Sequence, residues 1–333
     1  MNFLKVNRDT DYLSIENTVC LKGIFSMFVL MHHLYCLSLS CGTVINTRFE
    51  FMGYLSVAVF FFCTGYGLMG SYISKGKAYI RTFPKNRILQ FYCTYLLFTA
   101  LYLVMYSLLG DKITLTSVAQ ALIIPNKDDS QTILYGWYLQ AALILYIAFY
   151  FVFLMVSRYR YQLIGFTLAL LAYCVLCIWL GLSPTWYQSV FAVLLGMLWH
   201  KCGSIVDAKT KKYKLGYVVF LFIVFCCTLL LGRRSLPETI FIPIRMFSAL
   251  IFVLLVLALI RIIPIRCKLT YWLGEHSLEL YALQGVPIVI FKRAFPIDNP
   301  IVYSLVVILC TIILAAIAHP VVKKITGAIK KIG

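Results

Sequence analysis

Apolar segments follow one another along almost the entire 333-residue chain, which is 62% hydrophobic and only 13% charged. About twenty apolar residues span a bilayer as a helix, and a helix satisfies its own backbone hydrogen bonds in hydrocarbon. We therefore predict an all-α, polytopic membrane helix bundle that forms a single domain over residues 1–333. About ten transmembrane helices are expected, over residues 18–39, 50–73, 88–109, 133–156, 162–181, 185–200, 215–232, 240–260, 271–291 and 301–320.

The basic residues indicate how the chain is oriented. With ten spans and both termini in the cytoplasm, 21 of the 30 Lys and Arg residues fall in internal segments and 7 in external loops. The positive-inside rule favours this orientation and accounts for the net charge of +18, so we predict no nucleic-acid partner. The N-terminus lacks the order of regions typical of a cleavable signal. We expect a multi-pass protein surrounded by membrane lipids.

The first predicted helix contains ionisable residues that are costly to place in hydrocarbon. Lys22 and His33 are eleven residues apart, which is about 16 Å along a helix and about 20° off three full turns. They share one stripe of the helix, whereas His32 is rotated by about 80°. An anionic ligand near Lys22 and proton exchange at His33 would suit this geometry. Two alternatives stay open: Lys22 extends to the headgroups, or the histidine hydrogen-bonds a neighbouring helix.

Five separated blocks resemble the membrane acyltransferase family 3. "LKGIFSMFVLMHH" is similar to the family's basic residue, ten-residue spacer and His, with Gly23 after Lys22. "FFFCTGYG" resembles its Phe-Phe-x-x-Ser-Gly block, with Thr64 in place of Ser. "FPKNRILQFY", "GWYLQAALILYI" and "LGEHSLELYALQ" resemble later blocks. Two departures are that Gln284 replaces the usual late His, and that the Arg-x-x-x-Arg pattern is Arg81-x-x-x-Lys85.

The resemblance implies transfer of an acyl group, usually acetyl, from cytoplasmic acyl-CoA to a hydroxyl of a cell-surface or lipid-linked carbohydrate. It also implies a bacterial plasma membrane. His33 would be the central catalytic residue and Lys22 would help to hold the donor. Arg81, Lys85 and Arg87 would face the CoA phosphates, because guanidinium groups bind phosphate well. Their alternative role is orientation of the loop. Acyl-CoA would be a donor substrate, with no permanently bound cofactor.

Other polar residues in the spans are further candidates. Glu279 is predicted to orient His33 or a substrate hydroxyl, or else to pair with a cation such as Arg245. Gln284 is a candidate hydrogen-bond partner of the acceptor. Trp137 and Tyr138 would either stack on a sugar or belong to an interfacial aromatic belt. Cys174-x-x-Cys177 lies in an apolar run without other ligands, so we assign no metal site.

Two mechanisms and two functions follow. Either His33 is a general base for direct attack on the thioester, or an acyl-enzyme forms on His33 or on a hydroxyl such as Thr64. The chain ends soon after the tenth segment, so we expect no fused extracytoplasmic domain, and a separate extracytoplasmic transferase partner is possible. The alternative function is a transporter of a glycan or glycolipid without acyl transfer, which would be indifferent to acyl-CoA.

Overall fold

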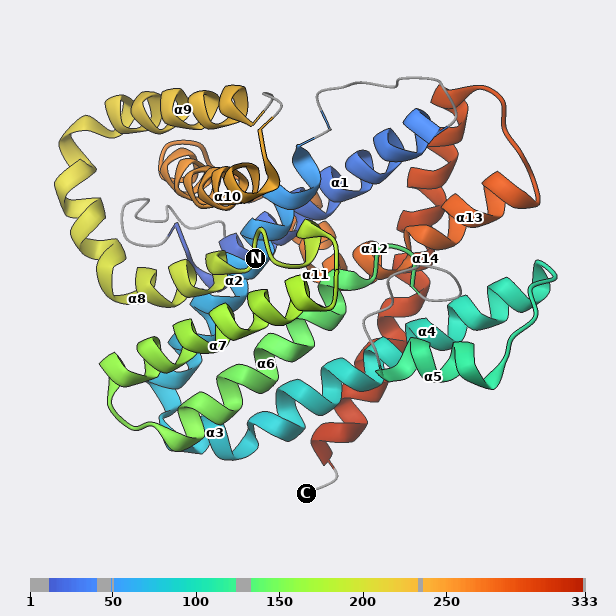
Figure 1. Ribbon diagram of the computed structural model, residues 1–333, viewed down its shortest axis with the longest axis horizontal. Coiled ribbons are helices and arrows are strands. Elements are labelled where there is room, and N and C mark those ends of the chain that lie inside the picture. The colour runs from blue at the N-terminus through green and yellow to red at the C-terminus, as the bar shows by residue number, and fades with distance from the viewer. Residues whose placement is uncertain (1–11, 41–48, 50, 124–132, 233–235, 332–333) are drawn as a thin grey trace.

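The computed structural model describes residues 12–40, 49, 51–123, 133–232 and 236–331, and its elements are helical throughout these ranges (Figure 1). The long helices are apolar on all sides, which is typical of helices that face either lipid or other helices. They are α1 (Ile15–Ser40), α2 (Met52–Lys75), α4 (Gln90–Leu108), α6 (Trp137–Met155), α7 (Tyr159–Trp179), α8 (Phe191–Thr210), α9 (Lys214–Leu231), α10 (Glu238–Ile260) and α14 (Pro300–Lys331). The shorter helices are α3 (Lys77–Phe83), α5 (Leu115–Ile123), α11 (Lys268–Glu275), α12 (Ser277–Leu283) and α13 (Gly285–Arg293).

Eight helical segments in the described part of the chain are long and apolar enough to cross a membrane. The polytopic all-α bundle is therefore confirmed. One of the eight, Pro184–Leu231, has 48 residues and would extend about 72 Å if it were straight. It contains both predicted spans 185–200 and 215–232, and it bends at the 3₁₀ turn Lys211–Tyr213 between α8 and α9 (Figure 1).

The predicted span 271–291 is divided among α11, α12 and α13 and therefore does not count among the eight. His276 separates α11 from α12 with φ −100° and ψ 9°, outside the helical region. Pro287 has no N–H for the carbonyl of Leu283, which explains why the regular helix ends before α13. As a result, Glu279 lies on the short helix α12 and Gln284 directly follows it, and both side chains are buried inside the bundle.

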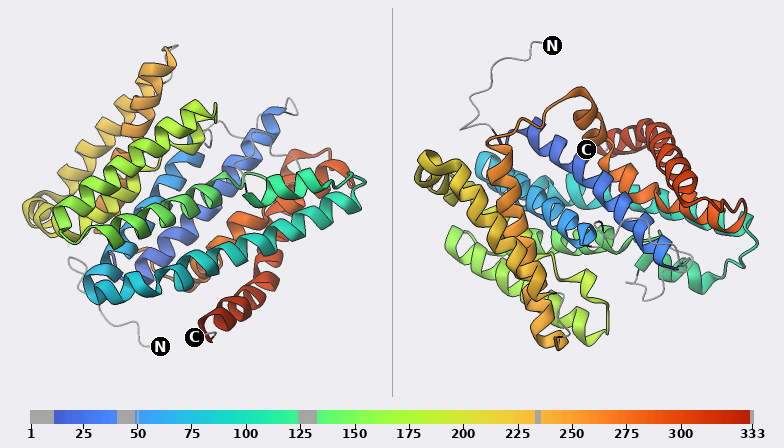
Figure 2. Two further views of the ribbon diagram at one scale, coloured as in Figure 1. Left: turned by 60° about the horizontal axis from the view of Figure 1, so that its bottom comes forward. Right: turned by 90° about the horizontal axis from the view of Figure 1, so that it is seen from above.

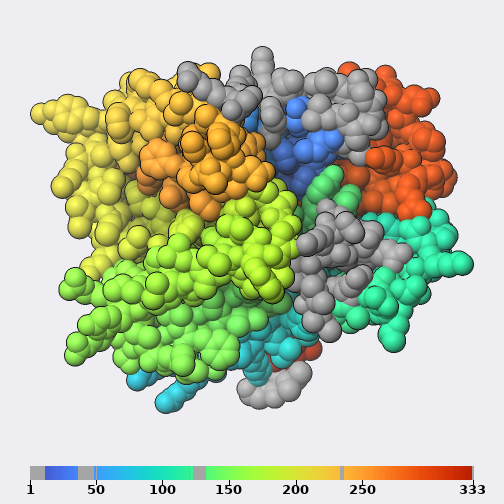
Figure 3. All heavy atoms as spheres, viewed as in Figure 1, coloured from blue at the N-terminus to red at the C-terminus, as the bar shows by residue number. Residues whose placement is uncertain are grey.

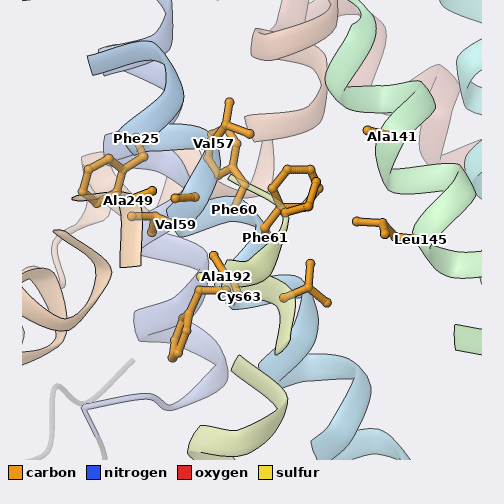
Figure 4. Packing of buried hydrophobic residues seen from close by; sticks show 14 of the residues in the cluster. Phe25, Val57, Val59, Phe60, Phe61, Cys63, Ala141, Leu145, Ala192 and Ala249 are labelled. Atoms are coloured by element: carbon orange, nitrogen blue, oxygen red, sulfur yellow. The ribbon is translucent and has the colours of Figure 1, made fainter. Parts of the chain in front are cut away.

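Helices α1 and α2 form the centre of the bundle. In α2, 78% of the most apolar window is buried, compared with 22% in α14 and 17% in the α8–α9 segment. Figure 2 shows α1 beside α2 with other helices around them, and on the face drawn in Figure 3 a small part of α1 is visible. Phe60 and Phe61 of α2 lie between α1 on one side and Ala141 and Leu145 of α6 on the other (Figure 4).

Glycines allow these central helices to touch. A Cβ at Gly23 would overlap the backbone of Thr270 and Gly274, so α1 and α11 cross with their backbones in contact. A Cβ at Gly65 or at Gly196 would likewise overlap the backbone of the facing helix in the α2–α8 pair. Small residues at such crossings are typical of helix packing in membranes. The contact at Gly23 therefore sets the position of α1 relative to α11 directly beside Lys22.

Candidate active site

Helix α1 presents Lys22 and His33 to two different cavities. The helix is continuous over Ile15–Ser40, so both residues lie on the predicted stripe. Lys22 lines a cavity of about 570 Å³, which we call the Lys22 cavity. His33 lines a cavity of about 270 Å³, which we call the His33 cavity. Lys22 and His33 therefore line two separate cavities, although they belong to the same helix.

The Lys22 cavity is polar and basic. Lys22 is half-buried, and no ion pair of Lys22 with an acidic side chain occurs among the described residues. Lys75 and Arg87 add two further cations to the lining. The remaining polar lining residues are Thr18, Thr64, Tyr66, Ser71, Ser74, Tyr146 and His200. This composition suits an anionic ligand with several hydrogen-bond acceptors.

The three basic residues predicted to face the donor are not grouped together. Arg87 belongs to the π-helical turn Pro84–Leu89 and lines the Lys22 cavity beside Tyr146. Arg81 is exposed on α3 and does not line the cavity. Lys85 Nζ donates to the carbonyl oxygen of Lys330 at 3.2 Å, so it points toward the end of α14. The structure thus places only Arg87 of this set with Lys22.

The His33 cavity is aromatic. Tyr135 stacks on the His33 imidazole with ring centroids 3.8 Å apart and an angle of 13° between the rings. Trp137 and Trp186 line the same cavity, with ring centroids 6.3 Å apart. Ser183 and Thr185 provide hydroxyls. None of its described lining residues is Lys, Arg, Asp or Glu, so this cavity is neutral except for its histidines.

Tyr135 holds its position at a backbone cost. Its φ is +61°, a left-handed conformation that is rarely adopted by residues other than glycine and asparagine. Tyr281 of α12 donates from its hydroxyl to the Tyr135 carbonyl oxygen at 2.7 Å. Strained residues at active sites persist because the surroundings fix them. Here the Tyr281 hydrogen bond and the stacking on His33 are the fixing contacts.

His33 and Gln284 lie next to each other with unused hydrogen-bonding capacity. His33 is 6% exposed and Gln284 is fully buried. The Gln284 side chain approaches the imidazole, yet neither His33 Nδ1 nor Gln284 Oε1 has a well-formed hydrogen bond. Gln284 Nε2 donates to the Tyr281 carbonyl oxygen at 2.9 Å. Buried polar atoms are nearly always paired. Because His33 lines the cavity and Gln284 does not, Gln284 is a neighbour of His33 inside the protein, and the structure does not place it as a direct contact of an acceptor.

The neighbouring histidine is engaged elsewhere. His32 Nδ1 lies 2.9 Å from the carbonyl oxygen of Phe49, and its Nε2 lies 3.5 Å from Cys36 Sγ. Its ring also packs where a side chain at Gly53 would be. His32 thus contacts the start of α2, while His33 contacts α12 and Tyr135. Both histidines nevertheless line the His33 cavity, so the rotation predicted from helical phase changes their contacts and not the cavity that they reach.

An aromatic partition separates the two cavities. We use this name for Phe60, Phe61, Tyr138 and Tyr281, whose ring centroids lie 5.1 to 6.3 Å apart in the contacting pairs. Tyr281 lines the His33 cavity, and Tyr138 approaches Thr64, which lines the Lys22 cavity. Trp137 therefore lines the His33 cavity, whereas its neighbour Tyr138 lies in the wall between the two cavities.

Glu279 contacts neither His33 nor Arg245 in the hydrogen bonds and ion pairs of the described residues, but pairs with His319. It is 2% exposed, and its Oε1 accepts a hydrogen bond from His319 Nδ1 of α14 at 2.8 Å. His319 in turn packs against His276, with ring centroids 4.1 Å apart. Arg245 instead lies over the rings of Tyr54 and Phe241, at 5.3 and 4.4 Å. Glu279 thus connects α12 to α14, and His319, which sequence reasoning left without a role, is its partner.

Several lining residues were missed by the sequence reasoning. Tyr135 and Trp186 lie in ordinary apolar or loop surroundings, and no motif distinguishes them from belt or core aromatics. Tyr281 belongs to the block "LGEHSLELYALQ" but was given no role. Lys75 and His200 sit at helix ends, where the positive-inside rule and the interface already explained them. The block "GWYLQ" was the available signal, because Tyr135 directly precedes it.

The comparisons with known proteins give the family. The family model described as an acyltransferase domain, of the acyltransferase 3 type, matches residues 19–319. Neither the curated proteins nor the solved structures yielded a match. The match covers nearly the whole chain, including α1 with Lys22 and His33 as well as α12 with Gln284. The chain is therefore a membrane-bound member of the acyltransferase 3 family.

Proposed function

We propose that the protein transfers an acyl group, acetyl in the simplest case, from acyl-CoA to a hydroxyl of a cell-surface or lipid-linked carbohydrate. The main observation behind this proposal is that two residues on the same face of α1 line two cavities of different charge. Lys22 lies in a basic cavity and His33 in a neutral aromatic one. A donor with many negative charges and a neutral polyol acceptor match these two spaces.

The Lys22 cavity suits acyl-CoA. Its volume of about 570 Å³ lies within the ~300 to 1,000 Å³ typical of ligand pockets. Lys22, Lys75 and Arg87 supply positive charge for the phosphates. In the predicted orientation, this cavity faces the cytoplasm, where acyl-CoA is available.

The His33 cavity suits part of a sugar. Its volume of about 270 Å³ is slightly below the typical ~300 Å³, so it admits only a small portion of an acceptor. Trp137 and Trp186 offer ring faces for the apolar side of a sugar, and Ser183 and Thr185 offer hydroxyls. Gln284 approaches the His33 imidazole from the protein interior and lines neither cavity, so it supports His33 and leaves the sugar to the other lining residues.

The chemical step is acyl transfer with His33 as general base. His33 accepts the proton of the acceptor hydroxyl while that oxygen attacks the thioester carbonyl. The new carbon–oxygen bond forms, the carbon–sulfur bond breaks, and the CoA thiolate takes up the proton from His33. The unpaired Nδ1 of His33 fits a base whose hydrogen-bond partner arrives with the substrate.

The acyl group has to cross the aromatic partition. In direct transfer, Tyr138 or Phe60 moves aside so that the thioester reaches His33. In the two-step alternative, Thr64 or His33 first receives the acyl group, and the acceptor removes it later. Single-turnover reactions with radiolabelled acetyl-CoA distinguish the two, because only the second leaves label on the denatured protein in the absence of acceptor.

The test of the function compares His33→Ala with His32→Ala in purified protein in lipid nanodiscs. Release of CoA from acetyl-CoA is measured with a panel of glycan acceptors. We expect His33→Ala to lower the rate by about 10²- to 10⁴-fold, the contribution typical of a general base. His32 also lines the cavity, but its two ring nitrogens lie near the Phe49 carbonyl oxygen and Cys36 Sγ, so His32→Ala should cause a smaller loss than His33→Ala.

Full activity in a correctly inserted His33→Ala protein would contradict both mechanisms. Transport of a glycan by wild-type protein, with no consumption of acyl-CoA, would instead support the transporter function.

A further inference from the structure

We propose that a third cavity, lined by Arg261 and Lys211, binds the nucleotide end of the acyl-CoA donor, its 3′-phosphorylated adenosine diphosphate. This inference rests on the proposed function, since it extends the donor site from the Lys22 cavity. We call this space the Arg261 cavity. Its volume is about 390 Å³, and its described lining comes from Tyr12 and Leu13, from Tyr66 of α2, from α8 and the turn after it, and from the end of α10.

The Arg261 cavity adjoins the Lys22 cavity. Leu13, Tyr66 and His200 line both, so the two spaces share a boundary. Acyl-CoA is long, and its thioester and nucleotide ends are separated by the pantetheine arm and the pyrophosphate. Two adjoining cavities accommodate such a molecule, with the thioester directed toward the partition and the nucleotide away from it.

Arg261 supplies a buried cation with free hydrogen-bonding capacity. It is 4% exposed and follows the last residue of α10. Its guanidinium donates to Thr210 Oγ1 at 2.7 Å and to the Asp207 carbonyl oxygen at 3.1 Å, while its Nε has no partner. Lys211 lines the same cavity from its exposed side. Together they present two positive charges.

Asp207, which is the acidic residue among the described lining residues of this cavity, is occupied by protein partners. Asp207 Oδ1 lies 3.2 Å from Arg261, and its Oδ2 accepts a hydrogen bond from the Tyr12 hydroxyl at 2.9 Å. Burial raises the pKa of Tyr12, so this phenol stays protonated and donates. Trp199 Nε1 donates to the Tyr12 oxygen at 2.9 Å. The carboxylate is therefore held by the protein, and the lining keeps one net positive charge.

Aromatic surfaces suit the adenine ring. Tyr66 stacks on His200 with ring centroids 4.3 Å apart, and this pair lies at the boundary of the two cavities. Tyr12 and Trp199 line the rest. Base–aromatic stacking contributes to binding of nucleotides irrespective of sequence. Phosphate recognition by Arg and Lys beside stacking rings matches a phosphorylated adenosine.

The residues expected from sequence to bind the nucleotide are less suitable. Arg81 is exposed and outside the cavities, and Lys85 is directed to Lys330. Arg87 and Lys75 remain available in the Lys22 cavity for the pyrophosphate. The adenosine 3′-phosphate is then left for Arg261 and Lys211.

The test uses Lys211→Glu, with Lys212→Glu as matched control. Both lysines are exposed and adjacent, but only Lys211 lines the Arg261 cavity. Steady-state kinetics in nanodiscs compare acetyl-CoA with S-acetylpantetheine, which lacks the nucleotide. We expect Lys211→Glu to raise KM for acetyl-CoA about tenfold with little change in kcat, and to leave S-acetylpantetheine unaffected. Lys212→Glu should match the wild type.

Calorimetric binding of CoA to wild-type and variant protein keeps this inference separate from the proposed function. CoA binding that Lys211→Glu weakens and Lys212→Glu does not, without any acyl transfer, would support the site and contradict the function. Equal effects of the two variants, equal loss with both donors, or no binding of CoA by the wild type would overturn the site.

Discussion

The Lys22 cavity and the His33 cavity lie along the same helix and are built from different side chains. The first contains three cations and several hydroxyls, whereas the second contains stacked rings and, among its described lining residues, no acidic or basic side chain other than histidine. Two cavities of different charge along one helix suit a protein that binds a charged substrate on one side and a neutral substrate on the other. Because the two linings differ so strongly, we expect the aromatic partition that keeps the cavities apart to matter for activity as much as either cavity.

Among variants of residues that neither bind the donor nor act as the base, the largest effect is expected from opening the partition with Tyr138→Ala. Tyr138 contacts Phe60, Phe61 and Tyr281, so its removal joins the two cavities. We expect hydrolysis of acetyl-CoA without acceptor to rise several-fold, because water gains access to the thioester. Transfer to the acceptor should fall about tenfold, since hydrolysis and a displaced thioester compete with it. CoA release and acylated acceptor are measured in parallel.

Tyr138→Phe is the control for this variant, because it keeps the ring and removes only the hydroxyl that approaches Thr64. If Tyr138→Ala hydrolyses acetyl-CoA no faster than Tyr138→Phe, the ring does not separate the cavities.

A smaller effect, confined to the His33 cavity, is expected from Tyr281→Phe. The substitution removes the hydrogen bond to the Tyr135 carbonyl oxygen and leaves the ring in the partition. Loss of one such bond costs about 1 kcal/mol of stability. Because Tyr135 then holds the His33 ring less firmly, we expect kcat to fall several-fold with KM for acyl-CoA unchanged.

Tyr303→Phe provides the comparison, since its hydroxyl also donates to a backbone carbonyl, that of Ile288 at 3.1 Å, but it lies outside the cavity. A decrease in kcat of the same size in both variants would mean that Tyr281 acts through stability and not through Tyr135.

The smallest effect is expected from Asp111→Asn, which tests a contact outside both cavities. Arg293 of α13 donates to both carboxylate oxygens of Asp111, at 2.7 and 2.8 Å. These hydrogen bonds hold the pKa of Asp111 below its ordinary value of 3.8. A lowered folded-state pKa means that the stabilisation is present above pH 3.8 and is lost as the pH falls below it.

We therefore expect a slight decrease in Tm for Asp111→Asn at pH 7 and a smaller decrease in acid, below pH 3.8. Surface ion pairs contribute little, so acyl transfer should not change. A variant whose Tm deficit is as large in acid as at neutral pH would show that charge is not the source of the effect.

The candidate site was predictable where it depends on local geometry. The eleven-residue spacing of Lys22 and His33 fixes their common stripe, because helical phase is a property of one segment. The same reasoning separated His32 from His33. The run of basic residues before α4 is visible in the sequence, and it made Arg81, Lys85 and Arg87 candidates for donor binding. Only Arg87 lines the Lys22 cavity, because the sequence does not show which side chain of such a run points inward.

Contacts between distant segments were not predictable. Glu279 was expected near His33 or Arg245, but its partner is His319, forty residues further along and on another helix. Tyr135 adopts a positive φ that no propensity favours for tyrosine, because packing on His33 and the Tyr281 hydrogen bond impose it. In each case the decisive contact joins residues whose sequence separation hides their proximity.

Three features could be read from the amino-acid sequence alone: the membrane environment, the all-α class and the helix stripe that carries Lys22 and His33. Each depends on hydrophobicity or helical period within a single segment. The tertiary structure decided that the stripe opens into two cavities and that aromatic rings from α2, α6 and α12 close the space between them. Membrane helices are apolar on all sides, so their patterns do not record which faces meet. Close packing at Gly23, Gly65 and Gly196 makes that choice.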